Sequence, residues 1–153
     1  MSQNVIPSFK SLGVSAPLLQ ALNRAGLHEP TPIQSKAIPA ALEGRDVLGC
    51  AQTGTGKTAG FGIPIAEMVK PENRFVQAVV LVPTRELAMQ VTAEIRKITK
   101  YSGIRVATLY GGEPIKRQID ALDRGVHAVV GTPGRVLDHL GRQTLRLDRV
   151  CIA

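Results

Sequence analysis

Ala51-Gln-Thr-Gly-Thr-Gly-Lys-Thr58 is the stretch that decides the fold. A hydrophobic run over 47–51 precedes it, and an apolar segment compatible with a helix follows over 58–69. This order of strand, glycine-rich loop and helix is typical of a phosphate-binding loop, or P-loop. The glycines let successive backbone N–H groups point at one spot, where the positive end of the helix also lies. The sequence therefore predicts a site for the phosphates of a nucleotide.

Two side chains of this loop have predicted roles. Lys57 can reach the terminal phosphates, and the Thr58 hydroxyl can ligate a magnesium ion that bridges them. The general pattern has Gly at the first position, where this chain has Ala51. The alternative is a surface loop rich in Gly and Thr that happens to end in Lys-Thr. The strand before the loop and the helix after it favour the P-loop.

Composition describes one soluble globular domain. The chain has 153 residues, of which 44% are hydrophobic and 20% charged. It has no apolar run long enough to span a bilayer and no secretory pattern at its amino terminus, so we expect a cytoplasmic protein. Cys50 and Cys151 fall in predicted buried strands and lack metal-ligand spacing, so we expect both to pack in the core.

The charge balance is compatible with a polyanionic partner. The net charge is +7, from 19 Lys and Arg against 12 Asp and Glu. With no Trp, two Tyr and three Phe, the chain has little material for stacking on bases. A nucleic acid would therefore be held by its sugar-phosphate backbone, with little sequence preference.

Strand and helix patterns alternate along most of the chain. Residues 1–14 are expected to be an extended lead-in to a single domain over 15–153. The predicted helices cover 15–25, 31–43, 57–69, 85–100, 114–124 and 133–140, and the predicted strands cover 46–51, 77–82, 105–110, 128–131 and 149–153. Such alternation predicts an α/β fold whose mostly parallel sheet has helices on both faces. Ligands of such sheets bind beyond the carboxyl ends of the strands.

The start of the second predicted helix has two interpretations. Thr31 and Gln34 have the spacing of a capping box, in which the Gln34 side chain only reaches back to the Thr31 N–H. The functional interpretation is that the Gln34 amide matches the N6/N7 edge of adenine. The residues alone favour the capping box.

Three further stretches fall at predicted strand ends: 83–88, 111–112 and 132–135. Each has an ordinary structural interpretation, because Thr84 and Thr132 suit helix N-caps, Pro133 suits a first helical turn and glycines suit turns. Taken together with Arg85 and Arg135, they suggest an edge of the sheet that binds a phosphate chain.

These motifs in this order resemble the amino-terminal RecA-like domain of a DEAD-box RNA helicase, over Phe9 to Ala153. The stretch 26–34 resembles the Q motif, and 51–58 resembles motif I, in which Ala at the first position is usual. Residues 83–88 resemble motif Ia, residues 111–112 resemble the GG motif, and residues 132–135 resemble motif Ib. The resemblance implies a RecA-like P-loop fold and an ATP-dependent RNA helicase that uses ATP and Mg²⁺.

The resemblance also implies the site residues. Catalytic roles fall to Lys57 and Thr58, with Thr58 as the metal ligand. The implied nucleotide-binding residues are Phe9, which would stack on adenine, Pro32, Gln34, Gln52, Thr53, Gly54, Thr55, Gly56, Lys57 and Thr58. The implied RNA-binding residues are Pro83, Thr84, Arg85, Gly111, Gly112, Thr132, Pro133, Gly134 and Arg135. On Gln34, the resemblance favours the adenine contact.

The family's Asp-Glu-Ala-Asp motif does not occur in this sequence, which ends at Ala153. We therefore expect a fragment without the second RecA-like domain, which binds nucleotide but hydrolyses it poorly. We expect a monomer, with a dimer through an exposed edge strand as the alternative. The competing functions are a non-catalytic nucleotide-binding or assembly module and a generic P-loop ATPase or small-molecule kinase. The ATPase or kinase would leave 26–34, 83–88 and 132–135 without a role.

Overall fold

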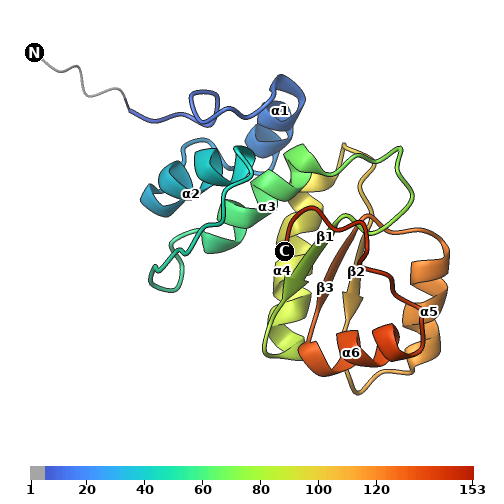
Figure 1. The fold of residues 1–153 in the computed structure, drawn as a ribbon. Coiled ribbons are helices and arrows are strands. Elements are labelled where there is room, and N and C mark those ends of the chain that lie inside the picture. The colour runs from blue at the N-terminus through green and yellow to red at the C-terminus, as the bar shows by residue number, and fades with distance from the viewer. Residues whose placement is uncertain (1–5) are drawn as a thin grey trace, which may run out of the picture.

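The computed structural model describes residues 6–153, and its elements follow the predicted alternation (Figure 1). The expected α/β class is confirmed. In chain order the elements are α1 (Ala16–Arg24), α2 (Pro32–Leu42), α3 (Lys57–Met68), β1 (Ala78–Leu81), α4 (Arg85–Thr99), β2 (Val106–Leu109), α5 (Ile115–Asp123), β3 (Ala128–Gly131) and α6 (Pro133–Gly141).

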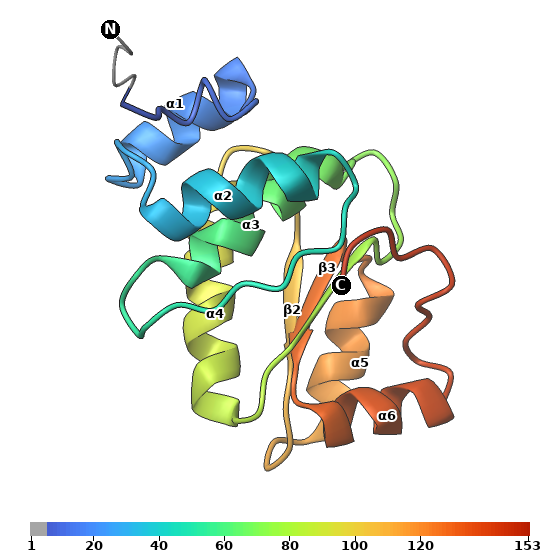
Figure 2. The same cartoon turned by 60° about the vertical axis from the view of Figure 1, so that its left-hand side comes forward.

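The sheet is parallel, and β3 is its central strand. The strand order is β1-β3-β2, with Ala78 and Val106 both in register with Ala128. Because the strands are parallel, their carboxyl ends meet at one edge and their amino ends at the other. The starts of α4 and α6 therefore lie at the same edge, which is the lower one in Figures 1 and 2.

Side-chain alternation places helices on both faces of the sheet, as predicted. Ala78, Val106 and Val130 belong to a core cluster that also contains residues of α3 and α4. Val79 and Val129 point to the opposite face, where they pack with residues of α5 and α6. Figure 2 shows these two helix layers on either side of the sheet.

A further cluster joins α1 and α2 to the outer side of α3. Its buried members include Phe9, Leu22, Ile38 and Ile63. The lead-in before α1 was expected to be extended, but its described part turns back on itself, and the Val14 N–H donates to the Phe9 carbonyl at 3.2 Å. Burial of Phe9 and Val14 stabilises this turn. The remainder of the predicted lead-in, residues 1–5, lies outside the described residues.

The predicted strand over 46–51 is wrong. The segment between α2 and α3 contains no strand, and Leu48 within it is 96% exposed. An apolar run becomes a strand only when a neighbouring strand pairs with its N–H and C=O groups, and none pairs with this segment in residues 6–153.

The predicted strand over 149–153 is reduced to a single bridge between Ile152 and Ala78. In it, the Val79 N–H donates to the Ile152 carbonyl at 3.0 Å. The expectation of two core cysteines is also wrong, because Cys50 and Cys151 are exposed free thiols. Within residues 6–153, none of the helices combines the length and apolar character that crossing a bilayer requires.

Candidate nucleotide and nucleic-acid site

The glycine-rich loop has the backbone of an anion-binding turn. Gly54 and Gly56 adopt φ angles of +82° and +83°, which side chains rarely tolerate. Gly56 is the N-cap of α3, so the helix begins immediately afterwards at Lys57. The first N–H groups of a helix have no acceptor inside it, and the helix dipole makes this end positive. The loop therefore presents donors and positive potential together.

Side chains of the loop bind its own backbone. The Lys57 ammonium donates to the Ala51 carbonyl at 2.7 Å, across the loop. The Thr55 hydroxyl donates to the Gln52 carbonyl at 2.7 Å. Thr58 follows in the first turn of α3 and is half-buried. Lys57 and Thr58 are thus next to the positive helix end, the position that their predicted roles require.

Gln34 connects the start of α2 to the glycine-rich loop. Its side-chain oxygen accepts from the Thr31 N–H at 3.0 Å, and its own N–H donates to the Thr31 hydroxyl at 3.5 Å, so the predicted capping box is confirmed. The side-chain nitrogen then donates to the Gly56 carbonyl at 3.0 Å. A Cβ atom on Gly56 would collide with this nitrogen. The buried amide therefore fixes the distance between two segments that are 22 residues apart.

The other two residues of the predicted adenine site have different surroundings. Phe9 is only 3% exposed and packs in the cluster beneath α1 and α2. Pro32 is exposed in the first turn of α2. A contact between Phe9 and adenine would require its ring to become accessible, so this role stays a prediction.

The start of α4 contacts the loop after β2. The Thr84 hydroxyl accepts from the Leu87 N–H at 3.2 Å, which confirms Thr84 as the N-cap. The Arg85 guanidinium lies over the Tyr110 ring, 4.8 Å from its centroid. An Arg85 nitrogen is also 3.5 Å from where a Gly112 Cβ atom would lie. The stretches 83–88 and 111–112 are therefore neighbours.

The start of α6 contacts the same loop from the other side. An Arg135 nitrogen donates to the Glu113 carbonyl at 3.1 Å and to the Gln118 side-chain oxygen at 3.2 Å. Thr132 occupies the N-cap position of α6, as predicted, but its hydroxyl makes no capping bond. Pro133 and the exposed Gly134 form the first turn.

Gln118 of α5 holds this arrangement together. Its side-chain nitrogen donates to the Tyr110 carbonyl at 2.8 Å and to a Glu113 carboxylate oxygen at 3.2 Å. Its side-chain oxygen accepts from Arg135 and from the His139 Nε2–H, the latter at 2.9 Å. The amide is 3% exposed and uses its full hydrogen-bonding capacity.

The network also defines the state of His139. Burial, followed by the nearby positive charge of Arg135, lowers the pKa of His139 from its ordinary value. The neutral ring donates from Nε2 to Gln118, and Nδ1 lies 2.8 Å from the Thr144 hydroxyl. Sequence analysis missed Gln118 and His139. The available signal was a polar residue on the apolar side of α5, three residues after Ile115 and four before Leu122.

The four stretches expected at one sheet edge form two groups. The stretches 83–88, 111–112 and 132–135 meet at the carboxyl ends of the strands, whereas the glycine-rich loop pairs with Gln34 beside the sheet (Figures 1 and 2). In residues 6–153, no hydrogen bond links the first group to the glycine-rich loop. The structure thus contains one group suited to a nucleotide and another suited to a phosphate chain.

Comparison with known proteins identifies relatives over nearly the whole chain. Residues 31–152 match the family described as DEAD/DEAH box helicase. The chain is 54% identical over 143 residues to the DEAD-box ATP-dependent RNA helicase CshA of Geobacillus kaustophilus, which covers 94% of this chain and 31% of that protein. It is 52% identical to the protein of the same name in Bacillus cereus, over 94% of this chain and 27% of that protein. The chain thus spans less than a third of these relatives.

Solved structures agree with this assignment. A DEAD box protein from Methanococcus jannaschii superposes with a TM-score of 0.88 at 44% identity, over 94% of this chain and 39% of that one. A hypothetical ATP-dependent RNA helicase from Sulfolobus tokodaii superposes with a TM-score of 0.80 at 39% identity, over 89% of this chain and 39% of that one. These neighbours confirm the RecA-like fold. The chain belongs to the DEAD/DEAH box helicase family.

Proposed function

We propose that residues 15–153 form the ATP- and RNA-binding, amino-terminal RecA-like part of an ATP-dependent RNA helicase. The observation that carries this proposal is the bond from the Gln34 side chain to Gly56, which joins the start of α2 to the loop in front of α3. An isolated P-loop serves many nucleotide-binding proteins, whereas here a glutamine amide lies beside it. To contact the N6/N7 edge of adenine, Gln34 would exchange its bonds to Thr31 and Gly56 for the base.

The residues present fit a magnesium nucleotide. The turn at Gly54 and Gly56 and the start of α3 suit its phosphates, with Lys57 exchanging its bond to the Ala51 carbonyl for a phosphate oxygen. Thr58 would provide the protein ligand to Mg²⁺, which usually keeps several waters and phosphate oxygens. Gln34, Pro32 and Phe9 would contact adenine, and Gln52, Thr53 and Thr55 would line the phosphates.

The second group suits the backbone of RNA. Arg85 and Arg135 present guanidinium groups beside the starts of α4 and α6, and the Thr132 hydroxyl makes no bond within its cap. Pro83, Thr84, Gly111, Gly112, Pro133 and Gly134 would shape the surface against the strand. None of these groups reads a base edge, so we expect little sequence preference.

For the whole protein we propose that it unwinds short RNA duplexes. We also propose that it acts in the cytoplasm. A second RecA-like domain would close on ATP and RNA bound here, and hydrolysis would release the product. Because this chain spans less than a third of its relatives, we test nucleotide binding, the property that its own described residues support.

Calorimetric titration with ADP and with GDP, each with magnesium, tests the nucleotide part. We expect ADP to bind at least tenfold more tightly, which is about 1.4 kcal/mol. Gln34→Ala should remove most of this preference. Gln20→Ala, on the exposed side of α1, is the matched control and should preserve it. Equal affinities of the unmodified chain for ADP and GDP would overturn the adenine site and favour a generic P-loop ATPase.

A further inference from the structure

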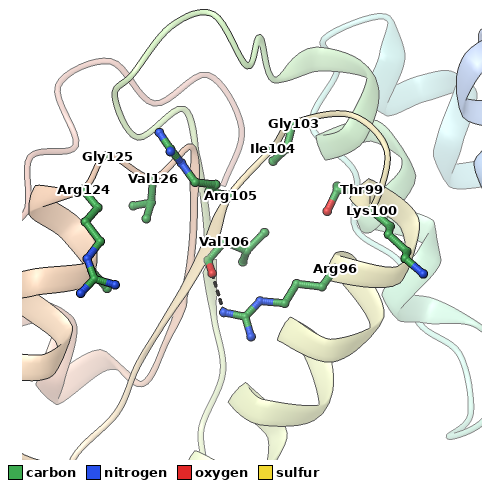
Figure 3. Close-up of a pocket in the computed structure, with 11 residues that line it drawn as sticks. Arg96, Thr99, Lys100, Gly103, Ile104, Arg105, Val106, Arg124, Gly125 and Val126 are labelled. Carbon is green, nitrogen blue, oxygen red and sulfur yellow. Dashed lines mark hydrogen bonds between the residues drawn. The ribbon is translucent and has the colours of Figure 1, made fainter.

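The edge of the sheet opposite the proposed RNA site contains a cationic groove. It lies at the amino ends of β2 and β3, between α4 and α5, and has a volume of about 460 Å³. We call it the amino-edge groove and define it by Arg96, Lys100, Arg105, Arg124 and Gly125 (Figure 3). Because the strands are parallel, this surface is at the other end of the strands from Arg85 and Arg135.

Cationic groups gather around a turn that leaves room for them. Gly125 adopts a φ of +84°, and a Cβ atom there would lie 3.3 Å from an Arg105 nitrogen and 3.6 Å from an Arg74 nitrogen. Two guanidinium groups from different loops therefore lie over the same glycine. On the other side of the groove, Arg96 donates to the Val106 carbonyl at 2.7 Å, which holds this guanidinium against the start of β2 (Figure 3).

These charges lack carboxylate partners. Residues 6–153 form three ion pairs, Arg45–Glu43, Arg142–Asp138 and Arg146–Asp148, and none includes a residue of the groove. Like charges that share a surface raise the local potential and repel each other. An anion would relieve this repulsion, so the groove is complementary to a chain of phosphates.

An exposed aromatic ring lies beside the groove. Tyr101 is 57% exposed, whereas most large apolar side chains of the chain are buried. The Arg24 guanidinium lies 4.8 Å from its ring centroid and the Lys100 ammonium lies 5.4 Å from it. A positive groove combined with an exposed ring is the arrangement that proteins use to track the backbone of a single strand and stack one of its bases.

We propose that the amino-edge groove and Tyr101 form a second binding site for single-stranded RNA, at the opposite edge of the sheet from the stretches 83–88, 111–112 and 132–135. Phosphates would occupy the groove along Arg96, Arg105 and Arg124, and one base would stack on Tyr101. None of the residues proposed to bind ATP belongs to this second site, so RNA binds there whether or not ATP is bound. It would hold a segment of RNA that flanks the strand at the carboxyl edge.

The chain offers a direct way to observe the two edges separately. It contains no Trp and only two tyrosines, Tyr101 at the groove and Tyr110 under Arg85. Tyr110→Phe leaves Tyr101 as the sole tyrosine, and Tyr101→Phe leaves Tyr110. Each variant is titrated with oligouridine of about eight nucleotides, a length within the usual site sizes of single-strand-binding folds. We expect saturable quenching of Tyr101 fluorescence in the Tyr110→Phe protein without any nucleotide.

Charge reversal tests whether the groove itself binds the strand. In the Tyr110→Phe background, Lys100→Glu with Arg105→Glu should weaken the quenching titration at least tenfold. It should also make the slope of log K against log salt shallower by about 1.4, the value for two lost contacts to a single strand. Lys36→Glu with Lys97→Glu is the matched control, because both are exposed, both lie outside the groove, and the change in net charge is identical.

Three results would overturn the proposal. The first is quenching of Tyr110 fluorescence without quenching of Tyr101 fluorescence. That result would show RNA bound at the carboxyl edge and none at the groove. The second is an equal loss of binding in both double variants, which would indicate a nonspecific effect of net charge. The third is tighter binding of poly-glutamate than of oligouridine to the Tyr110→Phe protein, which would assign the groove to an acidic protein partner. Quenching of Tyr101 alone would support the groove and contradict the proposed carboxyl-edge site.

Discussion

Gln118 is the residue on which the geometry of the carboxyl edge depends most. Its amide binds the end of β2, the loop at Glu113, and both Arg135 and His139 of α6. Arg135 uses one terminal nitrogen for these bonds and keeps the rest of its guanidinium for a ligand. Gln118 therefore acts as a positioning residue, because it fixes a group that we propose contacts RNA.

Gln118→Met tests this role, because it preserves the approximate volume of the side chain and removes its hydrogen bonds. Four partners lose a bond, of which His139 is buried and Tyr110, Glu113 and Arg135 are half-buried, so the free energy of unfolding should fall by about 1–3 kcal/mol. RNA affinity should fall about tenfold while ADP affinity is unchanged. Fluorescence anisotropy with labelled RNA and calorimetry with ADP measure the two effects. Gln90→Met on the exposed side of α4 is the control. Unchanged RNA affinity would limit Gln118 to a structural role.

The side chains whose contacts are local were predicted, and those whose contacts depend on packing were not. Thr31 and Gln34 lie on one helical turn, so local spacing was enough to predict the capping box. The contact from Gln34 to Gly56 spans 22 residues and depends on how α2 packs on α3. Phe9 was assigned by resemblance to an adenine contact, yet its burial is decided by the cluster of α1, α2 and α3.

Among the elements, β3 has the least space around it. It is the central strand, and all four of its residues are buried. A Cβ atom on Gly131 would lie 2.6 Å from a Val136 methyl group and 2.8 Å from the Leu109 carbonyl oxygen. The glycine at the end of β3 thus lets α6 pack closely against the sheet and positions the loop that precedes Arg135.

Gly131→Ala should therefore destabilise the protein by about 1–3 kcal/mol, the usual cost of overpacking a core. Gly141→Ala is the control, because no atom lies within 4 Å of its Cβ position at the end of α6. That change should be neutral or stabilise by up to about 1 kcal/mol through helix propensity. Urea denaturation followed by circular dichroism measures both. Equal midpoints for the two variants would contradict the packing argument.

The predicted helices and strands were confirmed where they depended on residues close together in the sequence. The helices have apolar residues at helical spacing, Thr31 and Thr84 cap α2 and α4, and the three strands of the sheet are short apolar runs between turns. The segment over 46–51 has the same apolar character but remains unpaired. Strand formation there requires a partner strand, which hydrophobic periodicity does not report.

At the scale of the whole molecule, two buried histidines link stability to pH. His127 is 1% exposed and His139 is 0% exposed. Desolvation is the largest cause that lowers the pKa of His127, and Arg105 and Arg74 lower it further against the opposing bond to Pro71. Its Nδ1 accepts from the Arg105 N–H at 2.9 Å, so a proton on Nδ1 would displace that bond. Both rings are therefore neutral in the folded protein near pH 7.

We expect the free energy of unfolding to fall as pH decreases from 7 toward 5. Below the ordinary pKa of 6.5, the unfolded state takes up protons that the folded state excludes, so stability rises with pH in this window. Each histidine contributes a slope of at most about 1.4 kcal/mol per pH unit. His127→Gln should remove its share of the slope, measured by urea denaturation at several pH values. The exposed His28→Gln is the control. A slope that is unchanged in His127→Gln would contradict the assignment.

Each of the two edges of the sheet carries its own set of positively charged side chains. The carboxyl edge carries Arg85 and Arg135 beside helix starts, whereas the amino edge carries the cations of the groove. The net charge of +7 predicted a polyanionic partner without indicating where it binds. Only the tertiary structure separates these two sets of cations, because the starts of α4 and α6 follow the carboxyl ends of β1 and β3, whereas the groove residues lie near the amino ends of β2 and β3.

The sequence by itself determined the α/β class, the helices, the caps at Thr31 and Thr84, the three paired strands and the order of the family's motifs. These properties depend on residues within a few positions of one another, where backbone sterics and local hydrogen bonds act. Tertiary structure alone decided that 46–51 is unpaired, that Gln34 binds Gly56, that Gln118 joins three elements and that cations meet at the amino edge. Each of these depends on side chains that are far apart in the chain and become neighbours only when the helices pack on the sheet.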